Sequence, residues 1–127
     1  MPPRPPQGTY PDWGVGRNGF GYCYEYTWDG RILNGGQAIP NAYCENRNPS
    51  YFNWGPGQDG YGYCYQYTPY NVVMNEGAAQ PNNYCEAYDP SYYAWGTGQD
   101  GQTYCYQYTP SGYIMNTGAA VPDAYCH

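Results

Sequence analysis

The stretch GYCYEYT at residues 21–27 decides the fold. Tyrosines occupy every second position, so they would share one face of an extended strand, while Cys23, Glu25 and Thr27 would share the other. The pattern YCYxYT recurs at residues 63–68 and 104–109, with glutamine in place of the glutamate. This strict alternation predicts a β-strand in each of the three copies.

The rest of the chain repeats with the same spacing. A Trp-Gly-x-Gly motif begins at Trp13, Trp54 and Trp95, each 41 residues after the one before, and a Tyr-Cys pair closes every copy. A fixed period of this length marks a repeat protein in which each copy buries a face against the others. The predicted organisation is a proline-rich arm at residues 1–9 and three repeats at residues 10–50, 51–91 and 92–127.

A turn follows each predicted strand, at residues 28–30, 69–71 and 110–112. Glycine or asparagine at its last position indicates a type I turn followed by a left-handed residue. We expect a hairpin with a returning strand at residues 32–34, 73–75 and 114–116, and no segment shows helical periodicity. The predicted fold is all-β, with three tandem disulfide-stapled β-hairpin repeats in a compact three-fold, β-trefoil-like arrangement or in a linear array of small modules. Three repeats of this length resemble the architecture of some small lectins, although their Gln-x-Trp motif is absent.

Aromatic residues and cysteines take the place of an ordinary aliphatic core. The chain has 20 Tyr, 4 Trp and 6 Cys among 127 residues, and the two cysteines of each repeat lie 21 positions apart. Two pairings respect the repeat: closure within each copy, or bonds from each copy to the next with a ring closure. Closure within each copy is favoured because it requires no ring. It would pair the cysteines in the order Cys23 with Cys44, Cys64 with Cys85, and Cys105 with Cys126.

Disulfides indicate an oxidising compartment, and we therefore expect a secreted, extracellular protein. Met1 is followed by prolines in place of an apolar leader, which we interpret as a mature chain. A metal site is not expected, because no CxxC spacing exists and His127 is the only histidine.

The charge of the chain excludes two classes of partner. The net charge is −6, lysine is absent, and the four arginines all lie within the first 47 residues. Nucleic acid and anionic membranes require a basic surface, which this chain cannot form. No segment is apolar enough to insert into a membrane.

Glycines at positions 14, 16 and 19 match the dinucleotide-binding fingerprint, but that motif requires a following helix and here a strand follows. We expect a tight loop instead, with an Asn or Asp before its last glycine. The candidate ligand-binding residues are those that recur in register with ring faces or polar groups. They are Trp13, Trp54 and Trp95, Asn18, Asp59 and Asp100, and Asn34, Asn75 and Asn116.

These residues suit a multivalent carbohydrate-binding, lectin-like protein with one aromatic and amide site per repeat, whose partner is a glycan or polysaccharide. One alternative is an extracellular structural or adhesive protein, rich in Tyr, Gly and Pro, that self-associates into a matrix or filament through its N-terminal arm or strand edges. Another is a disulfide-rich inhibitor or other protein-binding module. We expect neither an enzyme nor a cofactor, since the only histidine, His127, is the last residue and no carboxylate pair recurs.

Overall fold

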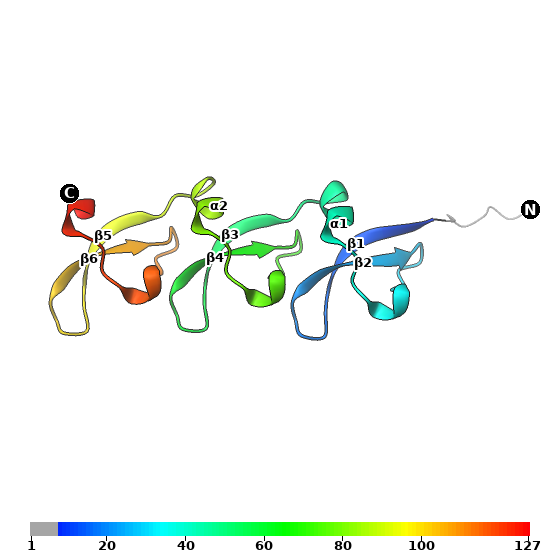
Figure 1. The fold of residues 1–127 in the computed structure, drawn as a ribbon, viewed down its shortest axis with the longest axis horizontal. Coiled ribbons are helices and arrows are strands. Elements are labelled where there is room, and N and C mark those ends of the chain that lie inside the picture. The colour runs from blue at the N-terminus through cyan, green and yellow to red at the C-terminus, as the bar shows by residue number, and fades with distance from the viewer. Residues whose placement is uncertain (1–7) are drawn as a thin grey trace, which may run out of the picture. The chain divides into compact units, whose positions relative to one another are not determined.

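The computed structural model describes residues 8–127, which fold mostly into three small antiparallel β-hairpins (Figure 1). Residues 1–7, the greater part of the predicted arm, lie outside the described residues. The hairpins are β1 Thr9–Val15 with β2 Gly21–Thr27, β3 Tyr51–Pro56 with β4 Gly62–Tyr67, and β5 Tyr92–Thr97 with β6 Thr103–Tyr108. The predicted strand in each copy is therefore confirmed, and within the described chain each strand pairs along its length only with its hairpin partner.

In each hairpin the predicted strand pairs with a different segment from the one expected. The strand that pairs with β2 precedes it, and Trp13 lies opposite Cys23 in the register. β1 has the sequence TYPDWGV, in which Pro11 and Gly14 weaken the strand signal. Both strands of a two-stranded sheet are edge strands, so the missing N–H of a proline is tolerated.

The expected returning strand is reduced to an isolated bridge between Tyr26 and Ile32. It ends where the backbone turns left-handed at Asn34, with φ 60°. Short 3-10 turns follow in each repeat, η1 Asn34–Gly36, η2 Asn75–Gly77 and η3 Asn116–Gly118. The prediction of a full returning strand is therefore wrong.

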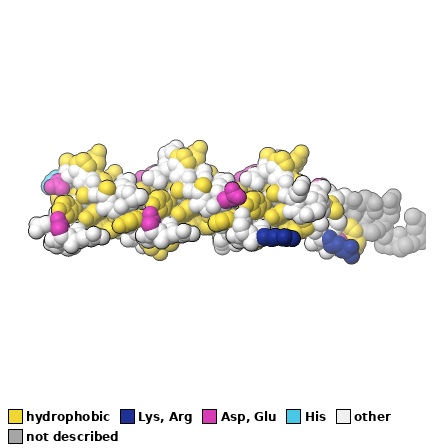
Figure 2. Space-filling view, turned by 60° about the horizontal axis from the view of Figure 1, so that its bottom comes forward, with side chains coloured by type: hydrophobic (Ala, Val, Ile, Leu, Met, Phe, Trp, Pro, Cys, Tyr) yellow, Lys and Arg dark blue, Asp and Glu magenta, His cyan; other side chains and the backbone are white. Residues whose placement is uncertain are grey.

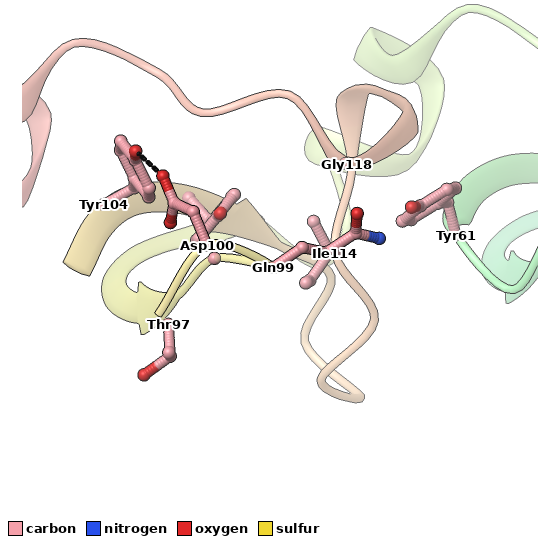
Figure 3. Close-up of a pocket in the computed structure, with 9 residues that line it drawn as sticks. Tyr61, Thr97, Gln99, Asp100, Tyr104, Ile114 and Gly118 are labelled. Atoms are coloured by element: carbon pink, nitrogen blue, oxygen red, sulfur yellow. Dashed lines mark hydrogen bonds between the residues drawn. The ribbon is translucent and has the colours of Figure 1, made fainter. Parts of the chain in front are cut away.

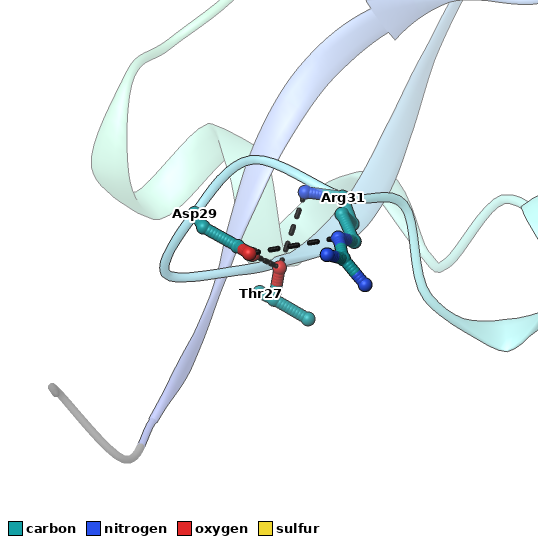
Figure 4. Close-up of polar contacts among 3 residues, drawn as sticks. All are labelled: Thr27, Asp29 and Arg31. Carbon is teal, nitrogen blue, oxygen red and sulfur yellow. Dashed lines mark hydrogen bonds and ion pairs between the residues drawn. The ribbon is translucent and has the colours of Figure 1, made fainter.

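The predicted turns after β2, β4 and β6 are confirmed. Gly30, Asn71 and Gly112 have φ values of 92°, 71° and 99°, and each donates its N–H to the carbonyl of the threonine three residues earlier. In the first repeat, side chains also hold this turn (Figure 4).

Thr27 is the centre of those side-chain contacts. Its Oγ1 accepts from the Arg31 N–H at 3.1 Å and donates to the carboxylate of Asp29. The hydrogen bond from Thr27 is the main reason why the pKa of Asp29 lies below its ordinary value. The Arg31 Nε also lies 3.5 Å from Asp29 Oδ2, but both side chains are exposed and this ion pair stabilises the turn little.

Helices close the repeats, which the sequence did not indicate. They are α1 Asn41–Arg47, α2 Asn82–Glu86 and the 3-10 helix η4 Asp123–Cys126. Each follows a proline, Pro40, Pro81 or Pro122, whose φ lies between −58° and −55°. The missing N–H of proline is no loss at a helix start. These helices are too short to show a helical period in the sequence.

The disulfides close within each repeat, as the favoured pairing predicted. Cys23 bonds Cys44, Cys64 bonds Cys85, and Cys105 bonds Cys126, and no cysteine is left free. In the first two repeats the bond ties the strand that follows the glycine loop to the closing helix. Three disulfides are compatible with an extracellular protein.

The described chain divides into two compact units. Unit 1 comprises residues 8–51 and 66–78, and unit 2 comprises residues 52–65 and 79–127. The core of unit 1 is Trp13, Cys23, Cys44 and Met74, with Ile39 packed against it. The first repeat supplies only part of this core, because Met74 belongs to the second repeat.

Unit 2 is built in the same way. Its core is Trp54, Cys64, Cys85 and Met115, with Phe52 packed against it, and Met115 comes from the third repeat. Both methionines are completely buried. Full burial of such a side chain stabilises a fold by about 1.5–3 kcal/mol. A buried methionine from the following repeat therefore completes the core of each of the first two repeats.

Candidate functional site

The glycine loop that closes each hairpin carries the polar group predicted to bind a ligand. In the first repeat Gly16 donates its N–H to the Phe20 carbonyl at 2.8 Å, and Asn18 Oδ1 accepts from the Phe20 N–H at 3.0 Å. Asp59 and Asp100 accept from the backbone in the same way, at 3.0 and 2.9 Å. The expected tight loop is confirmed, with an Asx turn in every copy.

A tyrosine of the adjoining strand engages the same polar group. Tyr63 donates its hydroxyl to Asp59 Oδ2, and Tyr104 donates to Asp100 Oδ2 at 2.5 Å. These hydrogen bonds lower the pKa of both carboxyls. The same bond raises the pKa of Tyr63 to about 12. Both carboxylates therefore stay ionised, with each tyrosine hydroxyl fixed beside its carboxylate.

A surface hollow of about 410 Å³ lies beside the loop of the third repeat, within unit 2 (Figure 3). We call it the Tyr61 hollow. It is lined by Tyr61, Thr97, Gly98, Gln99, Asp100, Tyr104, Tyr106, Ile114 and Gly118.

The side chains of the Tyr61 hollow combine ring faces with hydrogen-bonding groups. Figure 3 shows the Gln99 amide extending toward the Tyr61 ring, with the bonded Tyr104 and Asp100 at the other end. The Tyr104 ring meets Tyr106 edge-on, with centroids 6.3 Å apart. An amide, a carboxylate and aromatic rings thus line one cavity, and Asp100 is the predicted site residue among them.

Two of the three predicted tryptophans lie in the core. Trp13 and Trp54 are 3% and 6% exposed, and their indole N–H groups donate to the Asn48 and Asp89 carbonyls, both at 2.7 Å. Their ring faces are therefore not open to a ligand, and the interpretation of these two as binding platforms is corrected. Trp95 differs, because 46% of it is exposed.

The predicted asparagines Asn34, Asn75 and Asn116 hold a turn in each repeat. All three have a positive φ, between 58° and 60°. Their amides donate across the turn to Glu25 at 3.3 Å, to Gln66 at 2.9 Å and to Gln107 at 3.0 Å. Asparagine is among the few residues that tolerate a left-handed backbone, which accounts for its recurrence without a ligand.

A second hollow, in unit 1, consists of residues that the sequence analysis missed. It measures about 210 Å³ and is lined by Tyr10, Pro11, Asp12, Arg47, Asn48 and Tyr70. Tyr70 donates its hydroxyl to Asp12 Oδ1 at 3.0 Å, which raises the pKa of Tyr70. The Arg47 guanidinium lies 5.5 Å from the Tyr10 ring centre. Asp12 and Arg47 do not recur in the other repeats, so the repeat pattern carried no signal for this hollow.

Hydrophobic side chains lie at the surface (Figure 2), and many of the large exposed ones are tyrosines. Each hairpin carries a stacked tyrosine pair with ring centres 5.5–5.7 Å apart, namely Tyr10 with Tyr26, Tyr51 with Tyr67, and Tyr92 with Tyr108. Tyr51 and Tyr92 are 36% and 45% exposed. The surface therefore offers aromatic rings and few charges.

Residues 8–127 contain no cluster of three or more His, Cys, Asp or Glu side chains that could hold a metal ion. Within the same residues no helix is long and apolar enough to cross a membrane. Comparison with models of known families, with curated proteins and with solved structures finds no match to this chain. The chemistry of the hollows and of the surface is therefore the basis for the proposed function.

Proposed function

We propose that the protein is a secreted, multivalent carbohydrate-binding protein that recognises glycans through its glycine loops. The observation that carries the proposal is the Tyr61 hollow, where tyrosine rings, the Gln99 amide and the Asp100 carboxylate line one cavity. Sugar rings offer apolar C–H faces that stack on aromatic rings, and hydroxyls that bind amides and carboxylates. A volume of about 410 Å³ lies within the range of small-molecule sites.

Repetition of the loop supports binding at more than one site. Gln58 and Asp59 precede Gly60 in the second repeat, as Gln99 and Asp100 precede Gly101 in the third. The first repeat has Arg17 and Asn18 there instead. Weak sites on one chain gain strength from effective concentration when the ligand is a polymer. A β-trefoil-like closure and a linear array of modules would both serve this function, because each repeat has its own loop.

Exposure of Trp95 adds a ring face to the third repeat, and its indole meets the His127 ring edge-on, with centroids 6.0 Å apart. Recognition without catalysis is the chemistry proposed. The ionised carboxylates Asp59 and Asp100 each accept a tyrosine hydroxyl, which suits them to hydrogen bonding in place of proton transfer.

The test is glycan-array and polysaccharide binding by the full chain, followed by Gln99→Ala. We expect this substitution to weaken binding to the selected glycan several-fold without lowering the melting temperature, because Gln99 is exposed. Gln37→Ala removes the same amide at an exposed position outside the Tyr61 hollow and should leave binding unchanged. Failure to bind any glycan would refute the proposal, as would equal losses in the two variants.

A second candidate function, an extracellular structural or adhesive protein, is favoured by the exposed tyrosines. Tyr88 is 79% exposed and Tyr43 57%, besides the partly exposed stacked pairs. Electron microscopy of the purified protein at several concentrations separates the two candidates. Filaments or sheets would favour the structural function, and single particles that bind glycan would favour recognition.

A further inference from the structure

Each of the first two repeats contacts the turn of the following repeat at a glycine. We call the position of this glycine the receiving position. In unit 1 the Gly21 N–H donates to the Val73 carbonyl at 2.7 Å, and the Thr68 methyl packs over Gly21. A Cβ at Gly21 would lie 2.4 Å from Thr68 Cγ2, whereas ordinary contact distances are 3.4–4 Å. Any side chain at this position would therefore push the following turn away.

Unit 2 repeats this arrangement with its own residues. The Gly62 N–H donates to the Ile114 carbonyl at 2.8 Å, and a Cβ at Gly62 would again lie 2.4 Å from a threonine methyl, that of Thr109. The same close approach in both units shows that the receiving position requires the absence of a side chain.

The threonine methyl cannot easily turn aside. Thr68 is 1% exposed, and its Oγ1 accepts from the N–H groups of Tyr70 and Val72, both at 3.3 Å. Thr109 is fully buried, and its Oγ1 accepts from the Tyr113 N–H at 3.1 Å. Rotation of either side chain would leave a buried hydroxyl or turn N–H groups without these bonds, at a cost of about 1–3 kcal/mol.

The third repeat has the same core residues as the first two repeats, but a different residue stands at its receiving position. Trp95 and the Cys105–Cys126 disulfide correspond to the core residues of the first two repeats. Trp95 is 46% exposed, whereas Trp13 is 3% exposed beneath Met74. The position of Gly21 and Gly62 is taken by Thr103.

At the other end of the chain, the first repeat carries the matching turn. Thr27 and Leu33 stand at the positions of Thr68 and Met74, and both are only partly buried. A second copy of this chain could therefore offer its residues 27–33 to an open third repeat. Such a head-to-tail contact would leave both ends open for further copies and would extend without limit.

We propose that Thr103 closes the third repeat to a following turn, so that a second copy of this chain cannot dock its first repeat there. The Cβ of Thr103 occupies the space that the methyl of Thr27 from the second copy would need. Repeat arrays remain soluble when a terminal repeat differs from the inner ones on its outer face. The side chain of Thr103 at the receiving position supplies that difference here.

Sedimentation velocity of the full chain with its disulfides formed, over a series of concentrations, tests the proposal. We expect the unchanged protein and Thr103→Ala to stay monomeric, because alanine retains the Cβ. Thr103→Gly should assemble, with its average mass rising about twofold or more as concentration increases. Adding Leu33→Asp to Thr103→Gly should restore the monomer, because it places a charge on the docking turn.

Two outcomes would overturn the proposal. One is a Thr103→Gly protein that folds and stays monomeric at every concentration. The other is concentration-dependent assembly of the unchanged protein that Leu33→Asp abolishes.

A second variant tests the steric argument without assembly. Gly62→Ala places a Cβ at the receiving position of unit 2 and should displace Met115, which is completely buried. Peroxide should then oxidise Met115 faster than in the unchanged protein, with Met74 as the internal reference by mass spectrometry. Equal oxidation of Met115 in both proteins would contradict the argument.

Discussion

At the scale of single residues, backbone conformation accounts for asparagines that first suggested a ligand. Each 3-10 turn begins with two left-handed residues, and the second of them differs between repeats. Gly35 has φ 64°, but Glu76 and Thr117 hold φ values of 54° and 51°. A left-handed conformation costs a residue with a side chain about 1–2 kcal/mol. The second and third repeats therefore carry a strain that the first avoids.

Replacement of Glu76 by glycine should relieve this strain. We expect Glu76→Gly to raise the free energy of unfolding by about 0.5–1 kcal/mol, the relief of strain less the added chain entropy of glycine. Urea denaturation measures the change. Gly35→Ala is the matched control and should lower stability, since alanine at φ 64° acquires the strain that Glu76 loses. A lower stability of Glu76→Gly would contradict this explanation.

Tyr63 provides a pH-dependent test of the loop. Its pKa is raised to about 12, mainly by the hydrogen bond to Asp59, while an unfolded chain has a tyrosine pKa near 10. The folded state thus holds this proton more tightly, so the contribution to stability is fully present below pH 10 and is lost as pH rises from 10 to 12.

Tyrosine ¹³Cζ NMR can follow this titration directly. We expect Asp59→Asn to lower the pKa of Tyr63 toward its ordinary value, because the amide carries no charge. Asparagine at this position still forms the loop, as Asn18 does in the first repeat. An unchanged pKa in the variant would show that the carboxylate is not the cause.

At the scale of elements, the disulfide joins a short helix to a hairpin. In the second repeat it links β4 to α2 through Cys64 and Cys85, which are 21 residues apart. Closing a loop of this length stabilises a fold by about 3 kcal/mol on the chain-entropy estimate. Replacing Cys64 and Cys85 together by alanine should lower the free energy of unfolding by about that amount, measured by denaturant titration. Retention of full stability would contradict this role.

The elements also show what the sequence could and could not indicate. The strand at residues 21–27 and the disulfide pairing followed from alternation and spacing. The strand of Trp13 did not, because Pro11 and Gly14 obscure it and its edge position alone makes them acceptable. Burial of Trp13 and Trp54 depends on methionines 61 residues further along the chain, a contact that no local pattern reveals.

The sequence predicted the kinds of side chain at the candidate site better than it predicted which residues come together there. Asp100 lines the Tyr61 hollow as expected, but Tyr61 and Gln99 were not singled out. Tyr61 belongs to the second repeat and Asp100 to the third, so a site assigned within a single repeat could not include both.

At the scale of the whole molecule, the structural unit is a repeat whose core is completed by a methionine of the following repeat. Met74 fills the core of the first repeat and Met115 that of the second, while Trp95 in the third is left partly exposed. The proposed blocking of the third repeat by Thr103 would limit head-to-tail growth by this contact, which weighs against filaments of that type.

Nuclear Overhauser effects from methionine methyl groups test this completion most directly. In the oxidised protein labelled with ¹³C-methyl methionine, the Met74 methyl should show effects to side-chain protons of Trp13, Cys23 or Cys44, and the Met115 methyl to those of Trp54, Cys64 or Cys85. No such effect should reach Trp95. Methionine methyls without contacts to these cores, or with contacts to Trp95, would contradict the account.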